Sequence, residues 1–193
     1  GRYAAVVTEV GATLRSLTFD GSEVLWTFAE DEAPRGSMGR QLVPWPNRIR
    51  DGRYTFNGVE QQLPITEVPR NTALHGLGEG MAGRLVSHTD DSVAMAATIY
   101  PQAGWDAVLD DEITHSDDEY GLRVTLETRN IGSTSAPYGY GAHPYVAADL
   151  ANSRLTLPFA KELAVDPERL LPIEIGPLSP EHDFASPRLV GNT

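Results

Sequence analysis

Two of the five histidines stand in contexts that suit acid–base chemistry. Gly76 follows His75, and a residue without a side chain lets another group approach the ring closely. His143 comes after two small residues and before Pro144, which favours an extended backbone at His143 and so fixes where its ring points. An imidazole in either place could give and recover a proton near neutral pH. A structural role for each ring is the alternative that the residues alone leave open.

The stretch 41–58, QLVPWPNRIRDGRYTFNG, carries a second pair of candidates. Pro44 and Pro46 each fix φ and remove a backbone donor, so this part of the chain cannot run inside a regular β-ladder. Asn47 and Arg48 follow at once, placing an amide beside a planar guanidinium at the mouth of a predicted β-structure. Such groups could bind the oxygens of a ligand. A structural salt bridge or an exposed charge would also account for Arg48.

The other histidines, His88, His115 and His182, lie in polar or acidic surroundings and are predicted to be surface residues. We predict no metal site, because neither HxH nor HExxH spacing occurs and the chain has no cysteine. A GxSxG elbow and the GxGxxG and Walker motifs are also absent, which argues against a serine nucleophile and a phosphate cradle. Trp105 could stack on a ligand from a loop, but we favour a place in the core.

The elements that must position these candidates are predicted to be strands. Apolar and polar residues alternate over 93–99 and 122–126, the pattern of an antiparallel sheet with one face on a core. Residues 53–63 are predicted to form a hairpin, because Asn57–Gly58 is the strongest two-residue hairpin signal. No stretch keeps a helical period over about ten residues. Further strands are expected at 3–10, 12–19, 24–28, 155–157 and 162–165, with no clear periodicity from 167 onward.

Turn signals recur about every 8–12 residues, which predicts an all-β fold, a large antiparallel sandwich or barrel. A chain of 193 residues fits one domain, 1–193, with a sizeable core. The net charge of −12 argues against nucleic acid and against an anionic membrane as partners. No apolar run is long enough to span a membrane and no signal peptide is visible, so we expect a cytoplasmic protein, although the chain begins at Gly1 rather than at a methionine.

Three motifs in this order, PWPNRIRDGRYTFNG, LHG and GAHPY, resemble the aldose 1-epimerase (galactose mutarotase) family. Each motif is short, and it is their order over nearly the whole chain, on an all-β background, that carries the resemblance. The resemblance implies a large antiparallel β-sandwich of the galactose mutarotase-like type, with a sugar bound in an open cleft on one sheet. The implied reaction interconverts the α and β anomers of a free aldose, a small-molecule monosaccharide, without a cofactor.

The resemblance also implies roles for four residues. It places the family's general acid on His143, and the histidine near the ring oxygen and the anomeric end on His75. Two residues that hydrogen-bond sugar hydroxyls fall on Asn47 and Arg48. Acid–base assistance suits this chemistry, because opening the ring needs one proton delivered to the ring oxygen while another leaves the anomeric hydroxyl. Each such group is typically worth about 10²–10⁴-fold in rate.

The chain departs from the family pattern in three places. The family's general base, a glutamate, and a substrate-binding aspartate fall beyond Thr193, and neither Glu174 nor Glu181 is assigned in their stead. Residues 78–83 are mostly small where relatives carry bulky side chains, and Val146 stands where an aromatic residue often follows HPY. We therefore expect a fragment whose C-terminal strands are missing. Such a fragment alone would be inactive and poorly stable, because its sheets would expose unpaired edges.

Two other functions stay open beside an epimerase for free aldoses. A non-catalytic sugar-binding module or sensor could be built on the same sandwich, and it would be favoured if no glutamate faced His143. An epimerase for sugar phosphates would need basic residues converging on the cleft, and the acidic net charge argues against it.

Overall fold

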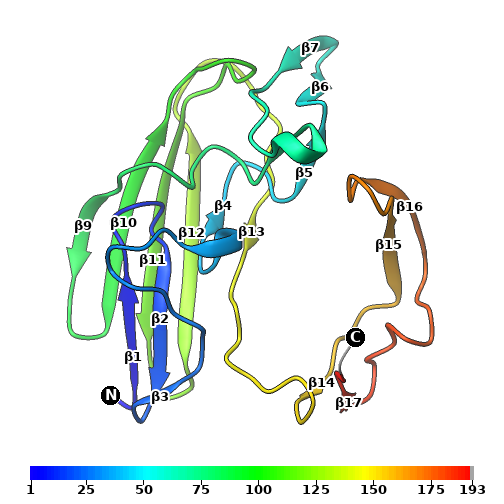
Figure 1. Ribbon diagram of the computed structural model, residues 1–193. Helices are drawn as coiled ribbons and strands as arrows, with labels where there is room; N and C mark the ends of the chain where they lie inside the picture. The colour runs from blue at the N-terminus through cyan, green and yellow to red at the C-terminus, as the bar shows by residue number, and fades with distance from the viewer. Residues whose placement is uncertain (192–193) are drawn as a thin grey trace.

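The computed structural model describes residues 1–191, and nearly all of its regular structure is β-strand. The helical segments in this part of the chain are two single turns of 3-10 helix, η1 (Arg35–Ser37) and η2 (Val68–Arg70). The predicted all-β fold is therefore confirmed. No helix among the described residues is long and apolar enough to cross a membrane. Figure 1 shows layered sheets formed by the first two thirds of the chain and, apart from them, small two-stranded pairs formed by the last third.

Four antiparallel strands form the larger sheet, in the order β12–β11–β10–β9 (Figure 1). Their bounds are β9 (Arg84–His88), β10 (Ser92–Ile99), β11 (Leu109–Asp117) and β12 (Leu122–Asn130). The strands predicted at 93–99 and 122–126 lie within β10 and β12. A continuous register joins β10 to β11 and β11 to β12, so this sheet is the most regular part of the molecule.

A smaller sheet contains β1 (Tyr3–Val7), β2 (Leu14–Phe19) and β3 (Ser22–Glu23) in that order. The strands expected at 3–10 and 12–19 are thus present in shortened form. The strand expected at 24–28 is wrong, because that segment makes only an isolated bridge between Leu25 and Val146.

The apolar core lies between these two sheets. Ala12, Met95 and Ile113 are buried together, and they join the turn before β2 to β10 and β11. Leu14 and Leu17 of β2 belong to a neighbouring buried cluster. Full burial of each large apolar side chain contributes about 1.5–3 kcal/mol. The two sheets therefore form a sandwich, as predicted.

Alternate residues of β11 face this core and are buried: Leu109, Asp111, Ile113 and His115. His115 is only 2% exposed, so the prediction of a surface residue is wrong. The sequence did not predict this strand because residues 110–112 are all acidic. In the strand, alternate side chains point to opposite faces, so only Asp111 of the three is buried. His88 and His182 are exposed, as predicted.

Three short antiparallel ladders carry the candidate segments: β4 with β13, β5 with β8, and β6 with β7. Their bounds are β4 (Gln41–Leu42), β5 (Arg48–Arg50), β6 (Arg53–Phe56), β7 (Val59–Gln62), β8 (Thr72–Leu74) and β13 (Gly141–Ala142). Residues 43–47, which contain Pro44 and Pro46 and are called the proline segment below, lie between β4 and β5 and outside any strand, as predicted. Asn57 and Gly58 have φ angles of 50° and 78°, which suit a type I′ turn, so the hairpin is confirmed.

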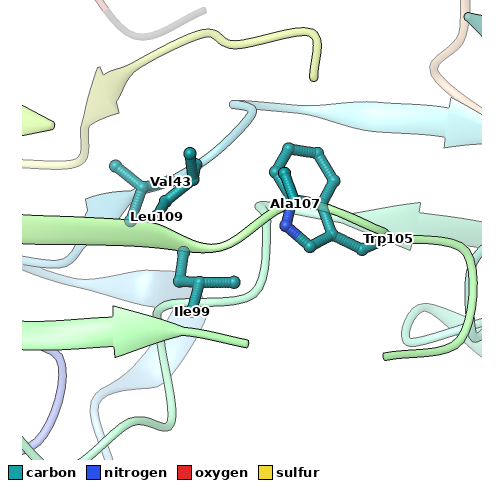
Figure 2. Close-up of a cluster of buried hydrophobic side chains, with 5 residues drawn as sticks. All are labelled: Val43, Ile99, Trp105, Ala107 and Leu109. Atoms are coloured by element: carbon teal, nitrogen blue, oxygen red, sulfur yellow. The ribbon is translucent and has the colours of Figure 1, made fainter. Parts of the chain in front are cut away.

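A second core cluster anchors the proline segment. Figure 2 shows its buried members, Val43, Ile99, Trp105, Ala107 and Leu109. Trp105 is 1% exposed, which confirms its predicted place in the core. Its ring lies 6.3 Å from that of Trp45, measured between centroids. Because Val43 belongs to both the core and the proline segment, the packing fixes where that segment runs.

The last third of the chain forms two pairs of strands, which Figure 1 shows apart from the sandwich. They are β14 (Arg154–Leu155) with β17 (Arg188–Leu189), and β15 (Lys161–Val165) with β16 (Pro172–Pro177). The strands expected at 155–157 and 162–165 correspond to β14 and β15, whereas β16 and β17 were not predicted.

Arg169, between β15 and β16, ties this segment back to the body of the molecule. Its guanidinium donates to the carboxylate of Asp51 at 2.7 Å and to the carbonyls of Arg70 and Asn71, each at 2.9 Å. The segment around β15 and β16 is thereby held next to η2 and β8, the elements that border the candidate site.

Candidate functional site

Asn47 and His75 lie opposite each other at the ends of β5 and β8. The amide of His75 donates to the carbonyl of Asn47 at 3.0 Å, and the amide of Asn47 donates to Nδ1 of the His75 ring, also at 3.0 Å. Their φ angles are 65° and 61°, a left-handed conformation that residues with side chains seldom adopt. The pair extends the β5–β8 ladder by one step and holds the imidazole against the end of that ladder.

Gly76 allows the backbone after His75 to pack closely against Val43 of the core. The carbonyl of Val43 accepts hydrogen bonds from the amides of Leu77 at 2.7 Å and Gly78 at 3.1 Å. A Cβ at Gly76 would lie 1.9 Å from that same oxygen, and the φ of Gly76 is 85°. Only glycine fits there. Since Val43 is part of the buried cluster, core packing rather than a free loop sets the position of His75.

His143 continues the β4–β13 ladder by one residue. Its amide donates to the carbonyl of Arg40 at 3.1 Å, and its carbonyl accepts from the amide of Gly39 at 2.9 Å. In β13, Gly141 packs on the ring of Pro46, where an added Cβ would come within 2.8 Å. A small residue therefore lets the strand that carries His143 approach the proline segment.

The two predicted histidines come together at this point. The rings of His75 and His143 meet edge to face, with centroids 5.6 Å apart and an interplanar angle of 81°. Tyr145 stacks on His143 at 5.2 Å and 18°, and its hydroxyl donates to the carbonyl of Gly36 at 3.2 Å. Both imidazoles are half-buried, so solvent and a small ligand can reach them.

The hydrogen bond from Asn47 defines the protonation of His75. Nδ1 accepts this bond, so it carries no proton and the neutral ring holds its hydrogen on Nε2. Burial lowers the pKa of His75 below its ordinary value, with two nearby carboxylates opposing and the charges of His143 and Arg48 assisting. At neutral pH His75 is therefore a neutral ring that can donate through Nε2.

Arg48 forms the structural salt bridge that the sequence left open. Its Nε donates to Oε2 of Glu67 at 2.7 Å and its Nη2 donates to Oε1 at 2.8 Å, with both side chains largely buried. Its Nη1 donates to Oδ1 of Asn47 at 3.2 Å, so the group that Asn47 can offer a ligand is its NH₂. Each Nη of Arg48 carries a second N–H that these bonds do not use. The salt bridge thus leaves Arg48 able to bind a ligand.

A second ion pair lies beside the imidazoles. Nη1 of Arg40 donates to Oε2 of Glu79 at 2.7 Å, while Nε of Arg40 and Oε1 of Glu79 are buried without a partner within the described chain. Both side chains line a cavity of about 390 Å³, which Gly76 also borders. None of the four predicted site residues lines this cavity.

Within residues 1–191 no group of three or more histidines and carboxylates could hold a metal ion. Sequence reasoning missed four residues of this neighbourhood: Arg40, Glu67, Glu79 and Tyr145. The HPY motif could have pointed to Tyr145, which it contains. Nothing in the sequence marked Glu67, because its contact with Arg48 depends on how the chain folds at η2.

Comparisons with known proteins bear on the whole chain. The family model described as aldose 1-epimerase matches residues 1–193. The uncharacterized protein YihR of Escherichia coli K12 is 37% identical over 153 residues, which are 79% of this chain and 50% of YihR. The chain therefore spans about half the length of this curated relative.

Solved structures share the fold. The GalM/aldose epimerase homologue from C. elegans superposes with a TM-score of 0.83 at 20% identity, over 97% of this chain and 62% of that one. The galactose 1-epimerase from Lactobacillus acidophilus NCFM superposes with a TM-score of 0.79 at 21% identity, over 98% and 60%. At such identities the similarity shows the fold alone, and it confirms the predicted antiparallel β-sandwich.

Proposed function

Because this chain belongs to the aldose 1-epimerase family, we propose that it binds a free aldose in the cytoplasm and interconverts its α and β anomers. The observation that carries the proposal is the edge-to-face contact of His75 and His143, with Asn47 hydrogen-bonded to the first ring and Arg48 to Asn47. Four residues from three separate segments of the chain form one solvent-accessible group of donors and proton carriers. Such a group suits a small neutral polyol.

In the proposed reaction His143 is the general acid. It gives a proton to the ring oxygen as the bond between that oxygen and the anomeric carbon breaks, while a base takes the proton of the anomeric hydroxyl. The resulting aldehyde turns about one bond and recloses on its other face, and both protons return. Stacking on Tyr145 supports this role, because it holds the His143 ring in one orientation. The reaction needs no cofactor.

The other three residues orient the sugar. His75 donates through Nε2, Asn47 through its NH₂, and Arg48 through its unused N–H groups. All of these groups are donors, and the hydroxyl and ring oxygens of an aldose accept hydrogen bonds. They hold the sugar so that its ring oxygen faces His143, and such positioning lowers the barrier by removing the need to align the reactants.

The base is not assigned to either carboxylate near His75. Arg48 lowers the pKa of Glu67 to about 2, which makes Glu67 a poor proton acceptor, and Glu79 is paired with Arg40. The family resemblance implies a glutamate beyond Thr193 as the base, and this stays a prediction.

Polarimetry on the full-length protein tests the proposal. Wild-type protein is expected to accelerate the mutarotation of α-D-glucose or α-D-galactose, and His143→Ala should lower that acceleration by about 10²–10⁴-fold. His88→Ala, at an exposed position away from the site, is the matched control and should retain full activity. Equal acceleration by wild type and His143→Ala would remove His143 from the mechanism.

A sugar-binding module without catalysis is the second candidate. It is favoured by the salt bridge of Glu67 with Arg48, which lowers the pKa of Glu67 to about 2 and makes this carboxylate a poor proton acceptor. Calorimetric titration with an aldose distinguishes the two functions. Binding without any acceleration of mutarotation would support the module, whereas binding with acceleration supports the epimerase.

A further inference from the structure

Glu67 accepts hydrogen bonds from four donors. Its Oε1 accepts from Nη2 of Arg48 at 2.8 Å and from Nη1 of Arg70 at 2.9 Å. Its Oε2 accepts from Nε of Arg48 at 2.7 Å and from the hydroxyl of Thr72 at 2.8 Å. An ionised carboxylate has about four lone-pair sites. Glu67 is therefore saturated by its own protein and is not free to bind a ligand.

The backbone holds Glu67 as firmly as its side chain does. Glu67 and Thr72 bridge the η2 turn, with the amide of Glu67 donating to the carbonyl of Thr72 at 3.0 Å and the amide of Thr72 returning a bond of 3.3 Å. Thr72 is fully buried and pairs with Arg50 of β5. The position of the Glu67 carboxylate is thus fixed by the backbone bonds to Thr72, a residue of the β5–β8 ladder.

Because Glu67 is fixed, it restricts Arg48, whose long side chain would otherwise sample many rotamers. The bidentate pair with Glu67 fixes the plane of its guanidinium, since both N–H···O bonds lie in that plane. Nη1 then lies 3.2 Å from Oδ1 of Asn47 and sets the orientation of that amide. A chain of contacts therefore runs from Glu67 through Arg48 to the side chain of Asn47, the residue whose backbone N–H donates to the His75 ring.

The ionisation of Glu67 also supports its role in holding Arg48. The hydrogen bonds of Arg48, with those of Thr72 and Arg70, lower the pKa of Glu67 to about 2. The carboxylate is ionised at every physiological pH, so its pairs with Arg48 and Arg70 persist over that whole range. One carboxylate balances only one of these two guanidinium charges, so what Glu67 gives Arg48 is a fixed direction for the N–H groups that it can offer a hydroxyl oxygen.

We propose that Glu67 is a positioning residue for sugar binding, which holds Arg48 and, through it, Asn47 in the orientation in which both donate to hydroxyl oxygens of one aldose. This inference rests on the proposed function. Glu67 itself does not touch the sugar.

The test is the kinetics of Glu67→Gln in the full-length protein. A glutamine side chain cannot pair with both nitrogens of Arg48, so KM for the aldose should rise about tenfold while kcat falls less, because the proton carriers stay in place. Glu60→Gln removes the same charge from an exposed position on β7 and should leave both constants unchanged. Unfolding curves establish that each variant is folded. An unchanged KM in folded Glu67→Gln would overturn the proposal.

Arg48→Lys tests the pair from its other side and does not depend on how well Glu67→Gln folds. Lysine keeps the charge but not the planar fork, so KM should rise to a similar extent. The double variant should be no worse than Arg48→Lys, because Glu67 acts through Arg48. Losses that multiply would show independent roles and contradict the proposal, and so would an unaffected KM in Arg48→Lys.

Failure of the proposed function looks different from failure of this inference. If the wild type binds an aldose without catalysis, the same variants are compared by calorimetric Kd, with the same expected tenfold loss. If the wild type neither binds nor converts any aldose, the proposed function and the sugar-binding role of Glu67 both fall. An active wild type with an equally active Glu67→Gln overturns the inference on Glu67 alone.

Discussion

The backbone amide of Asn47 donates a hydrogen bond to Nδ1 of the His75 ring across 3.0 Å. This bond can exist only while Nδ1 is unprotonated. The position of Asn47, at the end of the proline segment, therefore favours the neutral form of the imidazole. Burial of His75 favours the same neutral form. We therefore propose that, of the two imidazoles in contact, His75 is the hydrogen-bond donor to the sugar and His143 is the proton carrier.

Substitution by glutamine separates these two roles. Glutamine can accept from the backbone N–H of Asn47 and donate through its own NH₂, so His75→Gln should keep activity within about tenfold of wild type. His75→Ala removes the positioned donor and should lose about 10²-fold. His143→Gln should be as inactive as His143→Ala, because an amide cannot transfer a proton. Mutarotation rates measured by polarimetry compare the four variants. If His75→Gln were as poor as His75→Ala, His75 would be a proton carrier after all.

The pH dependence of activity can test whether the pKa of His75 lies below the ordinary histidine value. Because the folded protein disfavours the charged ring, His75 stays neutral down to pH values below the ordinary histidine pKa of about 6.5. Activity that depends on neutral His75 should therefore persist at about pH 6.5 and fall only at lower pH. An acidic limb of the kcat/KM profile that lies above about pH 7 and disappears in His75→Gln would contradict this assignment.

Gly76→Ala should destabilise the protein through a clash with the core. The new Cβ would lie 1.9 Å from the carbonyl oxygen of Val43, at a φ of 85°, so we expect a loss of about 3 kcal/mol or more in the free energy of unfolding. Gly58→Ala is the matched control, since its φ is 78° but its Cβ would meet no atom within 4 Å. Its expected cost is about 1–2 kcal/mol from backbone strain alone. Equal losses in denaturant unfolding would show that the close approach to Val43 is unimportant.

His115 should make the protein sensitive to acid. Burial lowers its pKa to about 4, and His115 is paired in register with Val93 of β10 and Val124 of β12. The unfolded chain binds a proton at about pH 6.5 but the folded chain does not, so stability is lost as the pH falls from about 6.5 to about 4. The full loss would be about 3 kcal/mol. Unfolding curves at several pH values measure it.

The matched comparison for His115 is His115→Leu, which suits the apolar surroundings and cannot be protonated. Its stability should change less than that of the wild type between pH 6.5 and pH 4. Burial raises the pKa of Asp111 on the same face of β11, which acts in the opposite direction on acidification, so the difference between the two proteins isolates His115. His88→Gln, at an exposed site, should follow the wild type. Identical pH dependence in wild type and His115→Leu would refute the effect.

Trp105→Ala should remove the largest side chain of the cluster in Figure 2 and leave a cavity beside Val43. Its expected cost is about 3–5 kcal/mol, measured by chemical denaturation. Trp26→Ala is the matched control, because Trp26 is 58% exposed and should cost about 0.5 kcal/mol or less. A loss below about 1 kcal/mol for Trp105→Ala would mean that this cluster does not hold the proline segment in place.

Local patterns in the sequence were enough for the strand class, the β6–β7 hairpin and the interruption between β4 and β5. Alternation of apolar residues, the Asn57–Gly58 pair, and Pro44 with Pro46 act on their own neighbours in the chain, so their effects can be predicted without coordinates. The same local view failed for His115. Its strand is acidic, and whether an alternating face is buried depends on the sheet that covers it.

The sequence by itself determined which residue types were available for chemistry, and its three motifs indicated the family. Only the tertiary structure decided that His75 is neutral, that Arg48 is paired with Glu67, and that the rings of His75 and His143 meet. The physical reason is that protonation and side-chain direction depend on groups that folding brings near. Those groups come from segments separated by tens of residues, and no spacing along the chain encodes such contacts.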